Sequence, residues 1–179
     1  RHAPLPSLLY RLGAGLFLAL HLAHGSAQNL ASTDDWSQVG QIARASGVPV
    51  VVVVTGEGCG HCQRMRRDLF TDPNACILLE KQAVAREFQR DTGGKVTDFD
   101  GERVRSRIFL TRYDVFATPT VLFLDSDGEP VAEPLVGYND PAAYRQLLSE
   151  RLEQGRFALA ARGKQGATAL ANAPSLPAH

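Results

Sequence analysis

Two cysteines and one histidine, gathered in four consecutive residues, are the part of this 179-residue sequence best suited to chemistry. Cys59 and Cys62 form a Cys-x-x-Cys pair, and His61 lies between them. Two thiols at this spacing can cycle between a dithiol and a disulfide, and a thiolate of the pair can attack a disulfide in another molecule. We therefore predict thiol–disulfide exchange, with Cys59, Cys62 and His61 as the catalytic residues.

The position of the pair assigns a role to each residue. The apolar run over 48–55 is typical of a strand buried on both faces, and the pair opens a helix expected over 59–69. Cys59 then lies where helix N–H groups are unpaired and the macrodipole is positive, which favours the reactive thiolate. Cys62 faces a buried stripe and suits the resolving role. A positive charge on His61 would stabilise the Cys59 thiolate further and make the disulfide a better oxidant.

Other roles of a Cys-x-x-Cys pair fit this chain less well. A zinc site needs a second cysteine pair, whereas only Cys76 remains, and c-type haem attachment needs a histidine where Gln63 stands. A purely structural disulfide is an alternative, but closing so short a loop constrains little chain entropy. For Cys76 itself we favour a buried, inert thiol over a third redox partner or an intermolecular disulfide.

The composition excludes several classes of function. Nineteen Lys and Arg balance nineteen Asp and Glu, and the absence of a basic block argues against a nucleic-acid partner. Four of the five histidines lie near the ends of the chain, and three cysteines are too few for a disulfide scaffold. We predict no metal, no cofactor and no nucleic acid; the expected partners are cysteine-containing proteins.

The rest of the sequence alternates between helix and strand patterns. In the last helix Tyr144, Leu147, Leu148 and Leu152 are predicted to face inward. We expect a loop over 92–103, either a solvated connection or a segment that flanks the active face, because these residues are polar and contain glycine. The order of elements predicts an α/β fold in which helices flank a central mixed β-sheet. Helices are expected over 34–45, 59–69, 72–81, 106–113 and 140–152, and strands over 48–55, 84–90, 120–124 and 130–136.

Both ends of the chain differ from its middle. Residues 1–27 have a basic start, an uncharged run and small residues before a cleavage point, which is the pattern of a secretory signal peptide. An uncleaved N-terminal anchor or a local amphipathic helix is the alternative. Residues 28–155 form the predicted folded domain. Residues 156–179 are rich in Ala, Gly and Pro, and we predict a disordered tail because little apolar area offsets the chain entropy.

The order of these motifs resembles that of the thioredoxin superfamily over about residues 48–153. The motifs are a strand followed by Cys59-Gly60-His61-Cys62, then Thr118-Pro119-Thr120, an Asp127-Gly128 hairpin and a last helix. A narrower resemblance, to the exported thioredoxin-like proteins of bacterial sulfur-oxidation (Sox) clusters, comes from residues 96–101, Thr118-Pro119-Thr120 and Gly137-Tyr138. The Cys-Gly-His-Cys centre is also similar to that of protein disulfide isomerases.

This resemblance implies a thioredoxin fold and further site residues. Pro119 is expected to be cis and to face the cysteine pair, and the backbone of Thr118 is expected to pair with a bound substrate strand. Gly58 and Gly60, on either side of Cys59, complete the predicted substrate-binding residues.

The sequence departs from the family pattern at two positions. Gly58 stands where the family usually has Trp, so an aromatic lid is missing. Val53 stands where many thioredoxins bury an Asp that handles the proton of the resolving thiol. Glu57 is closer to the pair in sequence, but the direction of its side chain cannot be deduced from its position.

We predict an exported, periplasmic thiol–disulfide oxidoreductase. The Sox resemblance implies a reductase of partner proteins, which a membrane thiol electron donor must recharge because the periplasm is kept oxidising. His61 alone favours the opposite direction, so a disulfide oxidase or isomerase is one alternative. A non-catalytic thioredoxin-fold module that binds a partner through the Pro119 face is the other.

Overall fold

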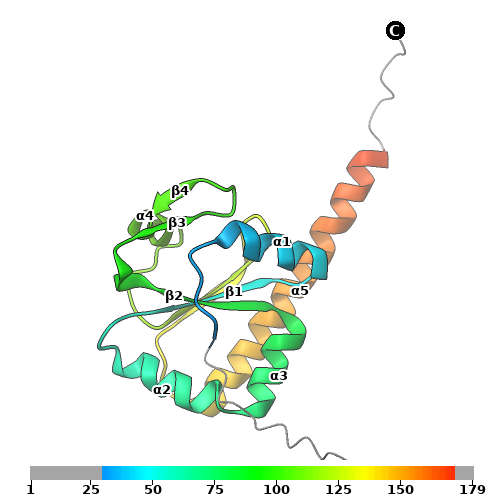
Figure 1. Ribbon diagram of the computed structural model, residues 1–179. Helices are drawn as coiled ribbons and strands as arrows, with labels where there is room; N and C mark the ends of the chain where they lie inside the picture. The colour runs from blue at the N-terminus through cyan, green and yellow to red at the C-terminus, as the bar shows by residue number, and fades with distance from the viewer. Residues whose placement is uncertain (1–29, 172–179) are drawn as a thin grey trace, which may run out of the picture.

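A four-stranded sheet lies at the centre of the protein, in a computed structural model that describes residues 30–171, with side chains up to residue 165 (Figure 1). The strands run in the order β2 (Val84–Gln89), β1 (Val50–Thr55), β5 (Thr120–Leu124) and β6 (Pro130–Val136). β2 is parallel to β1, whereas β5 is antiparallel to both β1 and β6. The sheet is therefore mixed, as the sequence predicts. The predicted signal peptide over 1–27 lies outside the described residues.

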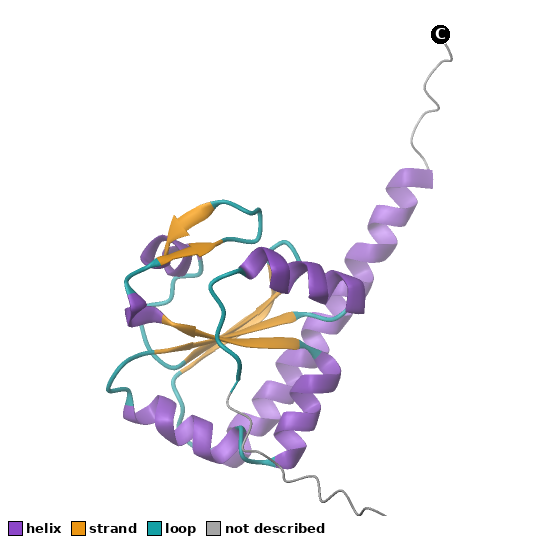
Figure 2. Ribbon diagram, in the orientation of Figure 1, coloured by secondary structure: helices purple, strands orange, loops and turns teal. Residues whose placement is uncertain are grey.

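In the described part of the chain, five α-helices lie against this sheet (Figure 2). Two of them, α1 and α4, cover one face, and the other three cover the opposite face. Among the described residues, no helix has both the length and the apolar character that a membrane crossing requires. In chain order the helices are α1 (Trp36–Ser46), α2 (Gly60–Leu69), α3 (Pro73–Gln82), α4 (Ser106–Arg112) and α5 (Pro141–Ala171).

β1 is buried along its whole length because its alternating valines enter two separate cores. Val51 and Val53 pack with Met65 and Leu69 of α2 and with residues of α3 and α5. The even-numbered valines pack on the other face with α1 and α4. Each fully buried valine contributes about 2 kcal/mol of hydrophobic stabilisation. The strand thereby fixes the place from which the cysteine-bearing helix starts.

The segment predicted as a loop over 92–103 contains regular structure instead. After a single 3₁₀ turn (Arg90–Thr92), β3 (Lys95–Thr97) pairs with β4 (Arg103–Arg105) as an antiparallel hairpin. Val96 of this hairpin is buried in the core beside α1 and α4. Strands of three residues are too short for their alternation to stand out from a polar loop, which is why the sequence pattern missed them.

The last helix is longer than the sequence predicts, and the expected disordered tail is wrong for residues 156–171, which continue α5. Several contacts hold the start of the continuation against the body, among them the packing of Ala158 and Leu159 on the core. Gly155 passes close to Val131, where an added Cβ would lie 3.1 Å from a valine methyl, and Arg162 forms an ion pair with Asp125. Leu147, predicted to face inward, is 39% exposed, whereas the other three predicted positions are buried.

Candidate functional site

The turn between β1 and α2 presents the cysteine pair at the start of a helix. β1 ends at the buried Thr55, and Gly58 turns the chain in a left-handed conformation with φ 64°. The Cys59 N–H donates to the Gly56 carbonyl at 3.4 Å, and α2 begins at the next residue, Gly60. Cys59 is the N-cap of α2, and its Sγ accepts from the Cys62 N–H at 3.1 Å. Cys59 therefore lies at the positive end of the helix.

The two cysteines are bonded to each other and differ in exposure. The Cys59–Cys62 S–S distance is 2.04 Å. Cys62 is fully buried with Met65 and Leu69 as the predicted stripe, whereas Cys59 is half-buried beside the exposed glycines Gly58 and Gly60. Only Cys59 is therefore accessible to an incoming disulfide, which matches the predicted division into attacking and resolving cysteines.

His61 is exposed, and its ring is tied to the end of β6. Its Nδ1 lies 3.0 Å from the carbonyl oxygen of Tyr138. A carbonyl can only accept, so Nδ1 donates and Nε2 is the ring nitrogen left to take up or release a proton. The Tyr138 carbonyl is held in turn, because the Tyr138 hydroxyl donates to Asp68 at 3.1 Å and its ring packs edge-on against Tyr144. Burial and this hydrogen bond raise the pKa of Tyr138 to about 12.

The proline loop lies against the turn that precedes the cysteines. The Thr118–Pro119 peptide bond is cis, and the Pro119 carbonyl accepts from the Gly137 N–H at 2.8 Å. Thr118 Oγ1 lies 3.3 Å from the point where a Cβ on Gly56 would be. The structure thus brings the predicted residues of both loops to one end of the sheet.

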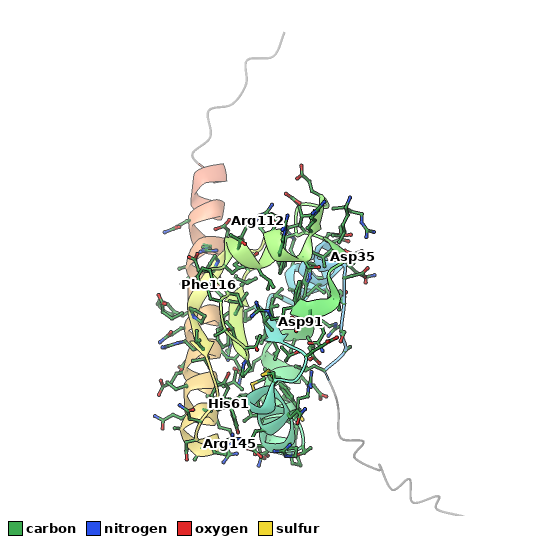
Figure 3. The ribbon with its side chains drawn as sticks, turned by 90° about the vertical axis from the view of Figure 1, so that its left-hand side faces the viewer. Asp35, His61, Asp91, Arg112, Phe116 and Arg145 are labelled. Atoms are coloured by element: carbon green, nitrogen blue, oxygen red, sulfur yellow. A yellow bond between two sulfur atoms is a disulfide. The ribbon has the colours of Figure 1, made fainter. Side chains whose placement is uncertain are left out.

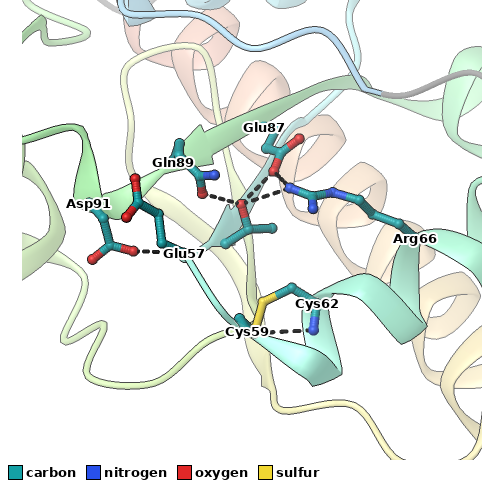
Figure 4. Close-up of polar contacts among 8 residues, drawn as sticks. Glu57, Cys59, Cys62, Arg66, Glu87, Gln89 and Asp91 are labelled. Atoms are coloured by element: carbon teal, nitrogen blue, oxygen red, sulfur yellow. Dashed lines mark hydrogen bonds and ion pairs between the residues drawn. A yellow bond between two sulfur atoms is a disulfide. The ribbon is translucent and has the colours of Figure 1, made fainter.

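Asp91 is a residue of this site that the sequence pattern missed. Its Oδ2 accepts from the Glu57 N–H at 2.7 Å and lies 2.9 Å from the Cβ position of Gly56 (Figure 4). The side chain of Glu57 is exposed, so this residue contributes its backbone rather than its carboxylate. Asp91 therefore holds the turn before Cys59, and a side chain at Gly56 would have to displace its carboxylate. Thirty-four residues separate Glu57 from Asp91, and no local pattern links them.

A second missed group is a buried carboxylate under α2. Glu87 of β2 is 8% exposed and lies opposite Val53 in the parallel register. It forms an ion pair with Arg66 of α2 and a hydrogen bond with Thr55, whose hydroxyl also lies 2.8 Å from Gln89 Oε1 (Figure 4). The carboxylate that is absent at Val53 is thus present on the neighbouring strand, where Arg66 compensates its charge.

Cys76 is a free cysteine on α3, outside the Cys59–Cys62 disulfide. Its thiol is half-buried rather than buried, and its Sγ donates to the Phe70 carbonyl at 3.1 Å. Burial, together with the nearby Glu80 and Asp72, raises the pKa of the Cys76 thiol. A raised pKa disfavours the thiolate, in keeping with the predicted inert role.

Comparison with protein families matches residues 38–152 to the thioredoxin-like domain. The chain belongs to the thioredoxin-like domain family. Among solved structures, it is similar to a thioredoxin from Thermus thermophilus, with 27% identity, a TM-score of 0.55, and coverage of 72% of this chain and 91% of that one. It also resembles a DsbH oxidoreductase in fold, with 15% identity, a TM-score of 0.50, and coverage of 75% and 92%. These matches show the predicted thioredoxin fold.

Two curated relatives of this thioredoxin-like chain are thiol:disulfide interchange proteins DsbD. The protein from Cronobacter sakazakii is 26% identical over 134 residues, and the one from Ralstonia nicotianae is 22% identical over 125 residues. The matches cover 73% and 70% of this chain but only 21% and 19% of those proteins, so the chain spans about a fifth of their length. Family membership and the Cys59–Cys62 disulfide together identify a thiol–disulfide oxidoreductase in general terms.

Proposed function

We propose that this protein is an exported reductase of disulfides in partner proteins. One observation carries the proposal: a half-exposed Cys59 caps the first turn of α2 while its bonded partner, Cys62, is fully buried. In this arrangement a partner sulfur can reach Cys59, whereas Cys62 stays buried. Cys62 then attacks the mixed disulfide and releases the partner.

The reaction balances as an exchange of two electrons. In the dithiol form, the Cys59 thiolate attacks one sulfur of the partner disulfide, and the other partner sulfur leaves as a thiolate that takes up a proton. Cys62 then loses its proton and attacks the Cys59 sulfur, which releases the second partner sulfur as a thiolate. The partner ends as a dithiol and this chain as the Cys59–Cys62 disulfide, the form seen here. A thiol electron donor at the membrane restores the dithiol.

The neighbouring groups support individual steps of this exchange. The positive end of α2 stabilises the Cys59 thiolate. His61 has a free Nε2 with which to exchange a proton at the surface, since its Nδ1 is held by the Tyr138 carbonyl. The backbone of Thr118 is proposed to pair with the partner segment, with Pro119 facing the cysteine pair, and Gly58 and Gly60 leave space for the segment beside Cys59.

The cellular setting is also part of the proposal. The DsbD relatives are interchange proteins by name, and the predicted signal peptide leads to the periplasm. The motifs over 96–101 and at Gly137-Tyr138 favour the group associated with sulfur oxidation. His61, exposed next to Cys59, favours instead a more oxidising centre, so an oxidase or isomerase is the second candidate.

A reduction potential measured against glutathione decides the direction. We expect a value near −270 mV, that of thioredoxin, whereas a value near −120 mV would identify an oxidase. Reduction of insulin disulfides tests the activity itself. The unaltered protein should reduce them and Cys59→Ser should not; an inactive unaltered protein would favour a binding module that does no chemistry.

A further inference from the structure

An exposed cluster of cations lies on the β3–β4 hairpin, which the sequence pattern missed. In the antiparallel register, Lys95 of β3 is directly opposite Arg105 of β4. The guanidinium of Arg103, on the same strand as Arg105, donates to the Lys95 carbonyl at 3.4 Å. All three residues are exposed, and we call their side of the hairpin the cationic face. Strand pairing creates this face, because Lys95 and Arg103 are eight residues apart in the sequence.

The alternation of side chains along the two strands explains why these cations share one face. Val96 is buried in the core beside α1 and α4, and Val104 packs against the same core. Successive side chains of a strand point to opposite faces, so the residues on either side of these valines point away from the core. The hairpin is fixed in this orientation, since the Thr97 N–H donates to the Asp34 carbonyl at 2.7 Å. The cationic face is therefore directed toward solvent.

The charges of the cationic face are placed where they oppose the stability of the fold. Two like charges directly opposite each other destabilise a strand pair, and Lys95 and Arg105 are such a pair. Arg107 adds an exposed cation in the first turn of α4, where the positive end of the helix disfavours it. Among the described residues, none of Lys95, Arg105 and Arg107 forms an ion pair. Local rules that a fold breaks without a compensating contact are typical of a functional surface.

The acidic residues of the hairpin do not neutralise this face. Asp98 is buried and forms an ion pair with Arg112 of α4. The Asp100 carboxylate accepts from the Glu102 N–H at 2.9 Å, within the turn that joins the two strands. Glu102 has the same parity as Val104, so the alternation puts it on the other side of β4 from the arginines.

Asp35 is the carboxylate that lies near Arg103, and it is already engaged in capping α1. Hydrogen bonds from the Gln38 N–H and the Ser37 hydroxyl, together with the nearby charge of Arg103, hold the pKa of the Asp35 carboxyl below its usual value. The bond from Gln38 is 3.0 Å long and makes Asp35 the N-cap of the helix. The cationic face thus keeps an excess of positive charge.

The cationic face lies at the same end of the central sheet as the cysteine turn. The cysteine turn follows β1 and the hairpin follows β2, and these two strands are parallel. Between β2 and the hairpin, Asp91 accepts from the Glu57 N–H at 2.7 Å and so joins the two segments. Figure 3 shows Asp91 between Arg112 of α4 and His61, the residue beside the cysteines.

We propose that the cationic face binds an acidic polypeptide segment of a partner protein. Arg103 and Arg105 are alternate residues of one strand, about 7 Å apart along it, and alternate carboxylates of an extended peptide have the same spacing. Arginine pairs with a carboxylate through two parallel hydrogen bonds. A short peptide needs only this hairpin, whereas a chain with nineteen cations and nineteen anions has no general attraction for a membrane or a nucleic acid. The inference holds whichever way the disulfide exchange runs.

The test measures, by fluorescence anisotropy, how two labelled peptides without cysteine bind to the unaltered protein. One peptide has Glu at alternate positions, separated by Ser, and the other has Gln in place of every Glu. The Glu peptide should bind about tenfold more tightly at low salt, and this preference should vanish at about 1 M salt, where charges are screened within about 3 Å. Lys95→Gln combined with Arg105→Gln should lower the affinity for the Glu peptide about tenfold and leave that for the Gln peptide unchanged.

The matched control is Arg64→Gln combined with Arg67→Gln, which removes the same charge from exposed positions of α2 and should keep the full preference. Equal losses in the two double variants, or an unaltered protein that binds both peptides equally, overturn the inference. The hairpin variant should have a thermal midpoint no lower than that of the unaltered protein, because a like-charge pair is removed. A lower midpoint would show that the fold itself uses these cations and would also overturn it.

Vesicles that contain phosphatidylserine test the other source of negative charge. Neither the unaltered protein nor the hairpin variant should bind them. If the unaltered protein binds these vesicles, and the hairpin variant loses that binding but keeps its affinity for the Glu peptide, the cationic face is a membrane contact and the inference is wrong. Because the peptides contain no cysteine, these results are independent of the insulin assay that tests the proposed exchange reaction.

Discussion

The two faces of the central sheet bury the same strand in different chemical surroundings. On the α2 face, Thr55, Glu87 and Arg66 form a polar network under the cysteine-bearing helix. On the α1 face, aromatic rings stack around Phe109, whose centroid lies 5.2 Å from that of Phe88 and 5.5 Å from that of Trp36.

The two faces therefore contribute to different properties of the protein. The aromatic face buries large rings and contributes mainly to stability. The polar face ties α2, the helix that carries the cysteines, to the sheet through the Arg66–Glu87 ion pair. Substitutions on the two faces should therefore change different measurements.

The largest effect is expected at the disulfide itself. Cys62→Ser leaves Cys59 able to attack but removes the release step, so turnover should stop at a mixed disulfide with the peptide substrate. Intact mass spectrometry of the protein after mixing with a disulfide-closed peptide measures this adduct. Cys59→Ser is the control and should form none; an adduct there would assign the attack to Cys62.

The second-largest effect is expected from removing one ring of the aromatic core. Trp36→Ala should lower the free energy of unfolding by about 4 kcal/mol, measured in urea, because the fully buried ring leaves a cavity. Trp36→Phe should cost only about 1 kcal/mol, since the indole Nε1 has no hydrogen-bond partner among the described residues. The reduction potential should stay the same in both; a change would mean that the two faces are not independent.

A smaller effect on stability is expected from the polar network. Arg66→Ala leaves the buried Glu87 without its cation and should lower the free energy of unfolding by about 2 kcal/mol. Arg67→Ala, at the exposed next position of α2, should change it by less than about 0.5 kcal/mol. Equal effects of the two substitutions would show that the Glu87 ion pair contributes nothing specific.

The smallest effect concerns alkaline pH. The pKa of Tyr138 is raised to about 12 by burial and by Asp68, so the folded protein keeps this proton after an unfolded tyrosine, with a pKa near 10, has lost it. Its contribution is fully present below pH 10 and is lost as the pH rises toward 12. Tyr138→Phe should flatten the decline in unfolding free energy across this range and cost about 1 kcal/mol at neutral pH. If the unfolding free energy of Tyr138→Phe declines with pH as steeply as that of the unaltered protein, Tyr138 does not have the raised pKa.

The sequence located the parts of the site that depend on neighbours along the chain. The apolar run of β1, the cysteine cap of α2 and the buried position of Cys62 all follow from spacing, and each is confirmed. Asp91 and Glu87 were missed because their partners are far away in the sequence: Glu57 lies 34 residues from Asp91, and Arg66 and Thr55 lie 21 and 32 residues from Glu87. A pattern read along one chain has no signal for contacts that only the sheet register creates.

The end of the last helix was predicted wrongly for a related reason. The continuation of α5 depends on Gly155 passing close to Val131 and on the Arg162–Asp125 ion pair, and these are contacts between distant segments. The composition of residues 156–171 alone predicts little burial. The α/β fold class could be predicted, because it follows from the order of helices and strands. Each of these elements is indicated by its own stretch of sequence.

The edges of the sheet have a consequence for how copies of this protein meet. β6 is an outer strand, and Pro130 and Pro134 interrupt its row of backbone donors, while Glu133 adds an exposed charge. At the opposite edge, the Glu87 N–H of β2 already donates to the Ala31 carbonyl. Neither edge offers a continuous ladder for another sheet, so the molecule is protected against edge-to-edge aggregation while it keeps a reactive sulfur at its surface.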